Sequence, residues 1–142
     1  MILYLDTSAF VKLYLEEPDS ARVRQLIGKS IACASHLITY AEMRSALARA
    51  EATGRISPAQ LAVARDQFER DWLSVEIINV DASLVRRAGE LSERFHLRGF
   101  DSVHLAAGER VVEATPQIIG TGFVAFDRAL QHAASELGLP TL

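Results

Sequence analysis

Short apolar runs rich in β-branched residues alternate along this chain with longer segments in which apolar residues recur at helical spacing. The short runs predict buried strands at residues 2–6, 31–35, 76–80 and 121–127, with a short fifth strand near residues 139–142. Such alternation is typical of βα units, in which helices cover parallel strands. The pattern therefore predicts an α/β fold with helices on both faces of a mainly parallel sheet.

Helices are expected between and after these strands. They span residues 8–16, 20–28, 37–54, 57–73, 82–96, 101–113 and 128–137. One start is well marked, because Ser57 is a capping serine followed by a proline at the first helical position. The segments 37–54 and 57–73 form a helical pair whose apolar stripes, with Met43 on one and Phe68 on the other, can face each other. Core packing explains these stripes best, and a dimer or partner surface is the alternative.

Composition places the chain among ordinary globular proteins. It is 49% hydrophobic and 23% charged over 142 residues, so one domain spanning residues 1–142 can bury its own core. No apolar run approaches the roughly 18 residues of a membrane-spanning helix, and the start MILYLD lacks the basic region of a secretory signal. We therefore expect a cytoplasmic protein with no membrane association, in which the lone Cys33 is a buried structural thiol. A net charge of −3 argues against a large nonspecific nucleic-acid surface, but not against an enzyme that holds a phosphate through a metal ion.

Four acidic residues, each unexceptional alone, are expected to converge. Asp6 and Asp127 each end a predicted strand, and the carboxyl ends of parallel strands form the ligand-binding edge of an open sheet. Asp101, in LRGFDSVHLAAG, is by itself best explained as a helix N-cap, but that helix enters from the same edge. Glu42 lies at the border of a buried helix face, where an exposed glutamate is the simpler interpretation. Asp6 also has a simpler interpretation, as a turn residue before a helix capped by Ser8.

Together these carboxylates indicate a metal site. Two unit charges ~4 Å apart repel by about 4 kcal/mol at an effective dielectric constant near 20, so ionised carboxylates need a cation in order to gather. An all-oxygen site suits Mg²⁺ or Mn²⁺, whereas zinc recruits His or Cys. His104 lies one turn after Asp101, yet a packed or hydrogen-bonded histidine is the simpler interpretation of that position. The other histidines, His36, His96 and His132, show no ligand spacing.

Other chemistries find little support in the sequence. There is no GxSxG elbow and no serine or cysteine with an evident base partner, and the GTG turn before the last long strand falls short of a phosphate-binding loop. A haloacid-dehalogenase-like phosphatase needs an acidic residue two positions after its nucleophilic aspartate, where this chain has Ser8. Lys12, Arg44, Arg49 and Arg98 lie near the acidic segments as candidate phosphate contacts, although solvated or structural roles are the simpler interpretation of each.

At these acidic segments the chain resembles the PIN-domain family, and within it the VapC toxins of prokaryotic toxin–antitoxin systems. The matching stretches, in chain order, are LDTSAFVKLYLEEP, ITYAEMRSALARA, LRGFDSVHLAAG and FVAFDRAL. The resemblance covers essentially the whole chain and implies a three-layer α/β/α sandwich with a Mg²⁺- or Mn²⁺-dependent endoribonuclease activity. It also implies a homodimer, inhibited by a VapB-like antitoxin whose C-terminal segment lies over the active-site groove.

The same resemblance assigns the catalytic acids to Asp6, Glu42, Asp101 and Asp127. We expect Asp6 and Asp101 to ligate the metal ion directly, and Glu42 and Asp127 to do so directly, through water, or at a second ion. The expected reaction is hydrolysis of an RNA phosphodiester, in which the ion polarises a phosphate oxygen and lowers the pKa of the attacking water. By family analogy the products carry 5′-phosphate and 3′-hydroxyl ends.

One position departs from the family pattern. Members commonly carry Ser or Thr two residues before the last aspartate, whereas this chain has Ala125. A hydroxyl expected near the site is therefore missing, and Thr7 or Ser8 is the candidate replacement. The alternative function is a catalytically weak PIN-like module that binds RNA or a partner, for which Ala125 is the only hint. Metal affinity separates the two, because a binding module has no need to hold Mg²⁺ among four carboxylates.

Overall fold

The central sheet has four parallel strands in the order β3-β2-β1-β4 in the computed structural model, which describes residues 1–142. The strands are β1 (Ile2–Leu5), β2 (Ala32–His36), β3 (Glu76–Ile78) and β4 (Thr121–Val124). β1 pairs with β2 on one side and with β4 on the other, so Leu3 lies beside Cys33 and Leu5 beside Val124. Because β1 is covered on both faces, its run of apolar residues is buried almost throughout.

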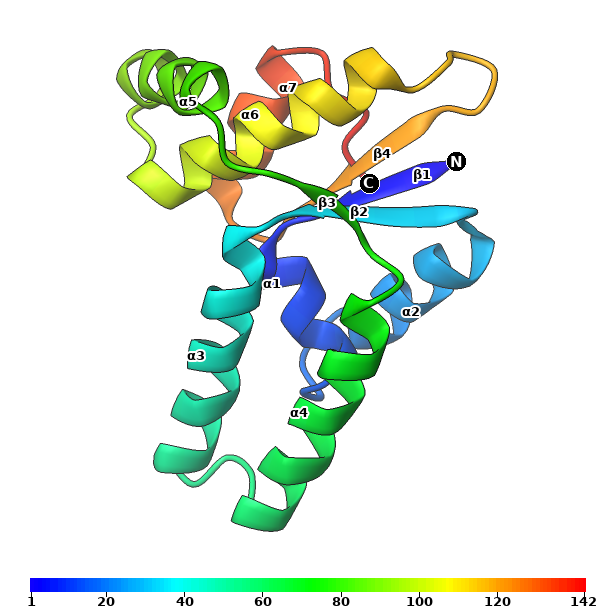
Figure 1. Cartoon of the computed structure of the whole chain (residues 1–142), viewed down its shortest axis with the longest axis vertical. Helices are drawn as coiled ribbons and strands as arrows, with labels where there is room; N and C mark the ends of the chain where they lie inside the picture. Colours follow the sequence, from blue (N-terminus) through cyan, green and yellow to red (C-terminus); the bar gives the residue numbers. More distant parts are fainter.

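Seven α-helices and one short 3₁₀ helix surround this sheet (Figure 1). They are α1 (Thr7–Phe10), η1 (Val11–Leu13), α2 (Ser20–Lys29), α3 (Ile38–Ala52), α4 (Pro58–Trp72), α5 (Ala82–Phe95), α6 (Gly99–Ala114) and α7 (Arg128–Glu136). Helices α5, α6 and α7 cover one face, and α1 to α4 lie on the other, where α3 and α4 extend away from the sheet. The predicted three-layer α/β/α sandwich is confirmed. None of these helices combines the length and the hydropathy that crossing a bilayer requires.

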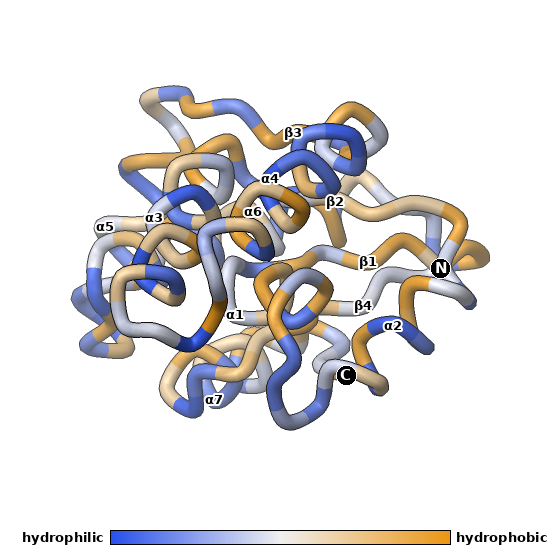
Figure 2. Tube along the Cα trace, turned by 90° about the horizontal axis from the view of Figure 1, so that it is seen from below, coloured by the Kyte–Doolittle hydropathy of each residue, from blue (hydrophilic) through white to orange (hydrophobic).

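Apolar side chains form a core on each face of the sheet. The largest cluster has 16 buried residues, among them Tyr4, Leu105 and Phe123, and it joins α5, α6 and α7 to the strands. A second cluster of seven includes Phe10 and Phe68 and packs α1 against α3 and α4. Figure 2 shows hydrophobic residues along β1 and many hydrophilic residues on the outer turns of helices and loops. The sheet is therefore held from both sides, and its strand ends are fixed in place.

The helical pair α3 and α4 packs as the sequence predicts. Met43 and Phe68 are fully buried in the second cluster, and Leu47 is buried in a third cluster between the same helices. A capping box begins α4: the Ser57 hydroxyl accepts from the amide of Gln60, whose side chain accepts from the amide of Ser57. Core packing thus accounts for the apolar stripes of the pair, and reciprocal capping fixes where α4 begins.

Two elements differ from the predictions. The helix expected at residues 8–16 is shorter, because α1 passes into η1 and the chain then turns before Pro18. The proline ring disfavours helical geometry at the residue that precedes it. No strand forms at residues 139–142, where only Thr141 makes an isolated bridge to β4. Pro140 has no N–H with which to extend a ladder there.

The strands also end before their acidic residues. β1 ends at Leu5 and β4 at Val124, so Asp6 and Asp127 lie in the loops that follow, rather than being the last strand residues. The prediction that Cys33 is buried is wrong: the residue is partly exposed and lines a surface pocket near α2 and α4.

Close packing of α6 on β4 gives a first testable prediction. A Cβ placed on Gly108 would lie 2.5 Å from two ring carbons of Phe123, which is buried and stacks on Tyr4 at a centroid distance of 5.3 Å. We expect Gly108→Ala to lower the free energy of unfolding by about 1–3 kcal/mol, because overpacking outweighs the better helix propensity of alanine.

Urea denaturation measures this change, and Gly89→Ala is its matched control. Gly89 lies within α5 and is exposed, and a Cβ added to it would have no neighbour within 4 Å. That substitution is expected to stabilise the protein slightly, by up to ~1 kcal/mol. Equal effects at the two glycines would contradict the steric explanation.

Candidate active site

The carboxyl ends of β1 and β4 mark the point where the strand order of the sheet reverses. β1 lies between β2 and β4, and the chain leaves toward β2 and returns to the other side only at β4. Open parallel sheets bind ligands in the crevice outside such a switch point. Asp6 follows β1 directly, and its amide donates to the carbonyl of Val124 across 3.1 Å. The loops that carry Asp6 and Asp127 therefore lie side by side.

All four acidic residues singled out in the sequence line one pocket at this edge, with a volume of about 440 Å³. The full lining is Asp6, Thr7, Ser8, Val11, Lys12, Glu17, Glu42, Ala46, Arg98, Asp101, His104, Phe126 and Asp127. Five carboxylates face only two basic side chains, so the pocket is acidic. The structure brings the four acids together, while their roles as metal ligands and catalysts stay predictions.

Asp6 is the most deeply placed of the four, with 4% of its surface exposed. Its carboxylate caps α1 by accepting from the amide of Ala9 at 2.8 Å, and it accepts from the Ser8 hydroxyl at 2.7 Å. Burial raises the pKa of Asp6 to about 6, and the negative charge of Asp101 adds a smaller contribution in the same direction. Desolvation, more than repulsion between carboxylates, is therefore what makes the ionised Asp6 costly.

Ser8 links Asp6 to the loop that carries Asp127. Its hydroxyl donates to Asp6 and accepts from the amide of Phe126 at 2.8 Å, so Ser8 does not cap the helix as the simpler interpretation assumed. Ala125 is buried in the largest apolar cluster and brings no hydroxyl to the pocket. Ser8 thus connects the two acidic loops, although neither Ser8 nor Thr7 donates to the carboxylate of Asp127.

Glu42 is held by hydrogen bonds from two other elements. Its side chain is 25% exposed on α3, and its Oε2 contacts the Thr7 hydroxyl and, at 2.8 Å, Nε2 of His104. Burial raises the pKa of Glu42, but the hydrogen bonds from His104 and Thr7 outweigh burial, so the pKa lies below its ordinary value. Glu42 is accordingly an oriented carboxylate, and the simpler interpretation of a freely exposed glutamate is wrong.

Asp101 is not the N-cap of its helix. α6 begins at Gly99 with Arg98 as its N-cap, and Asp101 lies in the first turn. The Arg98 guanidinium donates to Asp101 at 2.9 Å and lies 3.9 Å from the carboxylate of Asp127. Asp127, by contrast, does cap its helix, accepting from the amide of Leu130 at 3.0 Å. A single exposed cation therefore lies between two of the four acids.

The donor set of the pocket fits a hard divalent cation. All four acids offer oxygen atoms alone, as Mg²⁺ and Mn²⁺ prefer, and a nearby positive charge would favour the ionised form of the buried Asp6. No three His, Cys, Asp or Glu side chains stand together closely enough to form a metal-binding group in this structure. Glu42 is turned toward His104, and Asp101 toward Arg98. The four acids are thus gathered in one pocket without being closed around one point.

The hydrogen bond between His104 and Glu42 is a feature of the pocket that sequence reasoning did not predict. His104 is 2% exposed and lies between Tyr4 and Glu42, so its interpretation as a packed, hydrogen-bonded residue is correct but incomplete. Its spacing of three residues from Asp101, which puts both on the same side of α6, was the available signal. Of the basic candidates, Lys12 and Arg98 line the pocket, whereas Arg44 pairs with a glutamate on α4. Lys12 is itself tied to Glu17 and lies 4.5 Å over the Phe126 ring.

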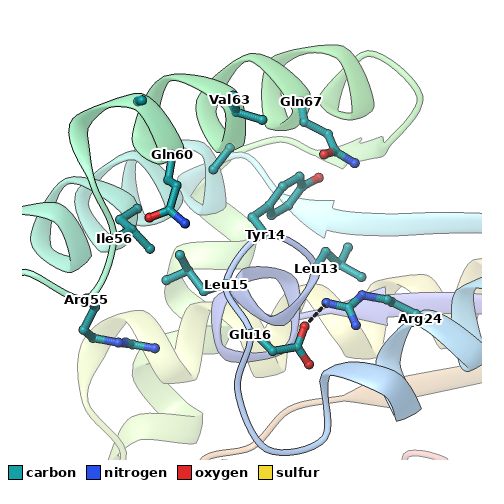
Figure 3. A pocket seen from close by; sticks show the side chains of 12 residues that line it. Leu13, Tyr14, Leu15, Glu16, Arg24, Arg55, Ile56, Gln60, Val63 and Gln67 are labelled. Carbon is teal, nitrogen blue, oxygen red and sulfur yellow. Dashed lines mark hydrogen bonds and ion pairs between the residues drawn. The ribbon is translucent and has the colours of Figure 1, made fainter.

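A second, larger cavity lies elsewhere, and its chemistry is different. Figure 3 shows this space of about 680 Å³ beside η1, α2 and α4, with Leu13, Tyr14 and Val63 pointing toward it. Its one ion pair within the cavity wall joins Arg24 to Glu16 at 2.6 Å. Carboxylates do not converge there, so the acidic pocket at the sheet edge remains the candidate active site.

Comparison with known proteins agrees with this geometry. The PIN domain family model matches residues 3–135. Ribonuclease VapC45 of Mycobacterium tuberculosis is 32% identical over 137 residues, which cover 96% of this chain and 92% of that relative. Two crystal structures are similar in fold to this chain. One is VapC20 from Mycobacterium tuberculosis, a sarcin-ricin loop cleaving toxin, with a TM-score of 0.67. The other is VapBC2 from Rickettsia felis bound to a promoter DNA fragment, with a TM-score of 0.65. VapC20 is 18% identical to this chain, and the match covers 92% of this chain and 94% of VapC20. VapBC2 is 17% identical, and the match covers 100% of this chain and 98% of the matched VapBC2 chain. With its parallel sheet, its acidic pocket at the switch point and a family match over nearly its whole length, the chain belongs to the PIN domain family.

Proposed function

We propose that this protein is a divalent-metal-dependent endoribonuclease that acts as the toxin of a VapBC-type toxin–antitoxin pair. The observation that carries the proposal is the convergence of Asp6, Glu42, Asp101 and Asp127, from four separate segments, on one pocket at the sheet edge. The 32% identity to a protein named as a ribonuclease, over 96% of this chain, supports the choice of RNA as substrate. In this proposal residues 1–142 act as one nuclease domain in the cytoplasm.

The four acids are proposed to bind the metal ion in different ways. Asp6 and Asp101 are proposed as direct ligands of Mg²⁺ or Mn²⁺, with Glu42 and Asp127 ligating directly or through water. A bound ion supplies a Lewis acid that polarises a phosphate oxygen and makes water a better nucleophile near neutral pH. Asp6 and Asp127 are fixed as helix caps, so their carboxylates are already oriented before substrate arrives.

Basic side chains at the pocket suit a phosphate substrate. Arg98 has 81% of its side chain exposed and lies at the mouth beside Asp101, so it is free to leave this partner and contact an incoming phosphate. Lys12 is buried and forms an ion pair with Glu17, so it offsets part of the negative charge of the pocket wall but is not free to contact an incoming phosphate. RNA approaches such an acidic pocket only when a cation offsets the carboxylates, which links substrate binding to metal binding.

The proposed partners are an inhibitory VapB-like antitoxin and a second copy of this chain. Support for the antitoxin comes from VapBC2 of Rickettsia felis, which has the same fold, and from the identity to a VapC ribonuclease. Purification from the native host tests the antitoxin directly: a small DNA-binding protein released only by denaturant is the expected companion. A solitary chain in that preparation would favour a housekeeping nuclease.

The central test is cleavage of structured RNAs by the purified chain with Mg²⁺, with Mn²⁺ or with EDTA. Cleavage is expected only with the metal ion, and Asp101→Asn is expected to remove it, because that variant deletes a charge from the ligand set without changing shape. Asp66→Asn, an exposed aspartate on α4, is the matched control and should cleave like the original chain. RNA binding without turnover in all conditions would favour the alternative of a PIN-like binding module.

A further inference from the structure

Tyr4, His104 and Glu42 form a continuous chain of hydrogen bonds that crosses three elements. The Tyr4 hydroxyl lies 2.9 Å from Nδ1 of His104, and Nε2 of the same ring lies 2.8 Å from Oε2 of Glu42. Tyr4 belongs to β1, His104 to α6 and Glu42 to α3. Tyr4 is 0% exposed, and His104 lines the pocket with only 2% of its surface exposed, so both offer a substrate little or no surface. We therefore consider the effect of Tyr4 and His104 on the acidic pocket as one transmitted through Glu42.

Hydrogen-bond satisfaction assigns one proton arrangement to the chain. The Tyr4 hydroxyl is fully buried and its only side-chain partner is Nδ1 of His104, so we assign its single proton to the contact with that nitrogen. In that arrangement Nδ1 accepts and the ring proton lies on Nε2, which faces the Glu42 carboxylate at 2.8 Å and has the Thr7 hydroxyl 3.3 Å away. The reverse tautomer would leave the phenol proton without an acceptor and place a ring lone pair against a carboxylate oxygen. Tyr4 therefore selects the tautomer that His104 presents to Glu42.

The donors converge on one oxygen of Glu42 and leave the other free. Oε2 receives both His104 Nε2–H and the Thr7 hydroxyl, whereas Oε1 has no hydrogen-bond partner in the structure. We propose that His104, set by Tyr4, is a positioning residue that fixes the Glu42 carboxylate so that Oε1 is presented to a divalent cation in the pocket. This inference rests on the proposed function, because it concerns how the same acidic pocket holds its metal ion.

Glu42 needs such positioning more than the other acids do. Asp6 and Asp127 have short side chains anchored to backbone amides at helix starts, so their local sequence orients them. Glu42 extends from the second turn of α3 on a longer, more flexible side chain, and its hydrogen bonds come from Thr7 and His104 rather than from a backbone amide. Partners that orient ligating carboxylates in this way commonly contribute 10–100-fold to metal affinity.

Two substitutions at His104 separate its two hydrogen bonds. Gln carries an amide N–H near the position of the imidazole Nε2, so His104→Gln keeps a donor for Glu42; Asn reaches only the position of Nδ1, so His104→Asn keeps a partner for Tyr4 alone. Mn²⁺ affinity, measured by calorimetry or electron paramagnetic resonance without RNA, is expected to fall about 10–100-fold in His104→Asn and to stay near the original value in His104→Gln. Thermal unfolding confirms that both variants are folded.

The kinetics should follow the affinity for the ion. At limiting Mn²⁺ the RNA cleavage rate of His104→Asn is expected to drop and to recover at saturating Mn²⁺. KM for RNA at saturating Mn²⁺ is expected to stay unchanged, because His104 exposes only 2% of its surface. In a Glu42→Gln background, His104→Asn should cause little further loss of affinity, since the residue acts through that carboxylate. A folded His104→Asn with the original Mn²⁺ affinity would overturn the inference.

Nitrogen-15 NMR of the metal-free protein tests the arrangement independently of activity. The imidazole of His104 should show a protonated Nε2 and an unprotonated Nδ1, and Tyr4→Phe should weaken that preference by removing the donor to Nδ1. A ring protonated on Nδ1 in the original chain contradicts the inference even if RNA is cleaved. Conversely, if the original chain binds no Mn²⁺, the proposed nuclease function fails, while the NMR result still decides the tautomer that Tyr4 selects.

Discussion

Asp6→Asn is expected to abolish RNA cleavage and at the same time to make the metal-free protein more stable at neutral pH. The loss of activity should be on the order of 1,000-fold, because several kcal/mol of charge stabilisation correspond to about three powers of ten in rate. Asparagine keeps the cap on α1, since its amide oxygen still accepts from the amide of Ala9. What disappears is the cost of ionising a carboxylate that is 4% exposed.

The sign of the stability change follows from the raised pKa of Asp6. Burial raises that pKa to about 6 in the folded chain, so between about pH 4 and pH 6 the folded state holds a proton that the unfolded state has lost. Stability therefore falls as the pH rises through this window, and the full penalty, about 3 kcal/mol, is present above it. Asp6→Asn lacks this penalty, so its advantage over the original chain should appear as the pH rises from 4 to 7.5.

Urea denaturation in EDTA at pH 4 and pH 7.5 measures the effect. Asp66→Asn, an exposed substitution on α4, controls for the loss of one negative charge and should show no comparable gain. Adding Mn²⁺ at pH 7.5 is expected to stabilise the original chain through binding to the folded state and to leave Asp6→Asn nearly unchanged. An Asp6→Asn protein less stable than the original chain at pH 7.5 would show that the ionised Asp6 carboxylate does not destabilise the folded state.

The position of two acids was predictable because strand ends dictate it. Parallel strands share one carboxyl edge, so an aspartate directly after β1 and another soon after β4 must come close together. Asp6 and Asp127 also cap the helices that follow, a local preference that the sequence already carries. The strands, the long helices and their order were likewise readable from hydrophobic period. At this edge, local propensity and tertiary placement agree.

The rest of the site depends on side-chain contacts, most of them between distant segments, which periodicity does not encode. Asp101 looked like an N-cap, but α6 begins two residues earlier, and the carboxylate instead faces Arg98. His104 was visible as a buried histidine, yet its partners are Tyr4, 100 residues away, and Glu42, 62 residues away. The sequence predicts which elements reach the pocket. Only their packing determines which side chains orient one another there.

Ser8→Ala should weaken the site and the fold together, most strongly below neutral pH. The substitution leaves the amide of Phe126 without its partner at 2.8 Å, which costs about 1–3 kcal/mol for a partly buried donor. It also removes the Ser8 hydrogen bond that lowers the pKa of Asp6, so this pKa is expected to rise further above its ordinary value. A protonated Asp6 cannot ligate a cation, and the proposed metal site then requires a higher pH to fill.

The measurement is Mn²⁺ affinity and RNA cleavage at pH 6 and pH 8, compared with Ser45→Ala, an exposed serine on α3 near Glu42. Ser8→Ala is expected to lose about 10–100-fold at pH 6, as other residues that orient metal ligands do, and to recover part of that loss at pH 8, where Asp6 ionises in both proteins. The recovery is the informative result, because a loosened loop alone would impair binding equally at both values. A loss that is the same at pH 6 and pH 8 would mean that Ser8 holds the β4–α7 loop without tuning Asp6. A loss that shrinks with rising pH would show that Ser8, the only hydroxyl bridging the two acidic loops, sets the pH range in which the site binds Mn²⁺ through the pKa of Asp6.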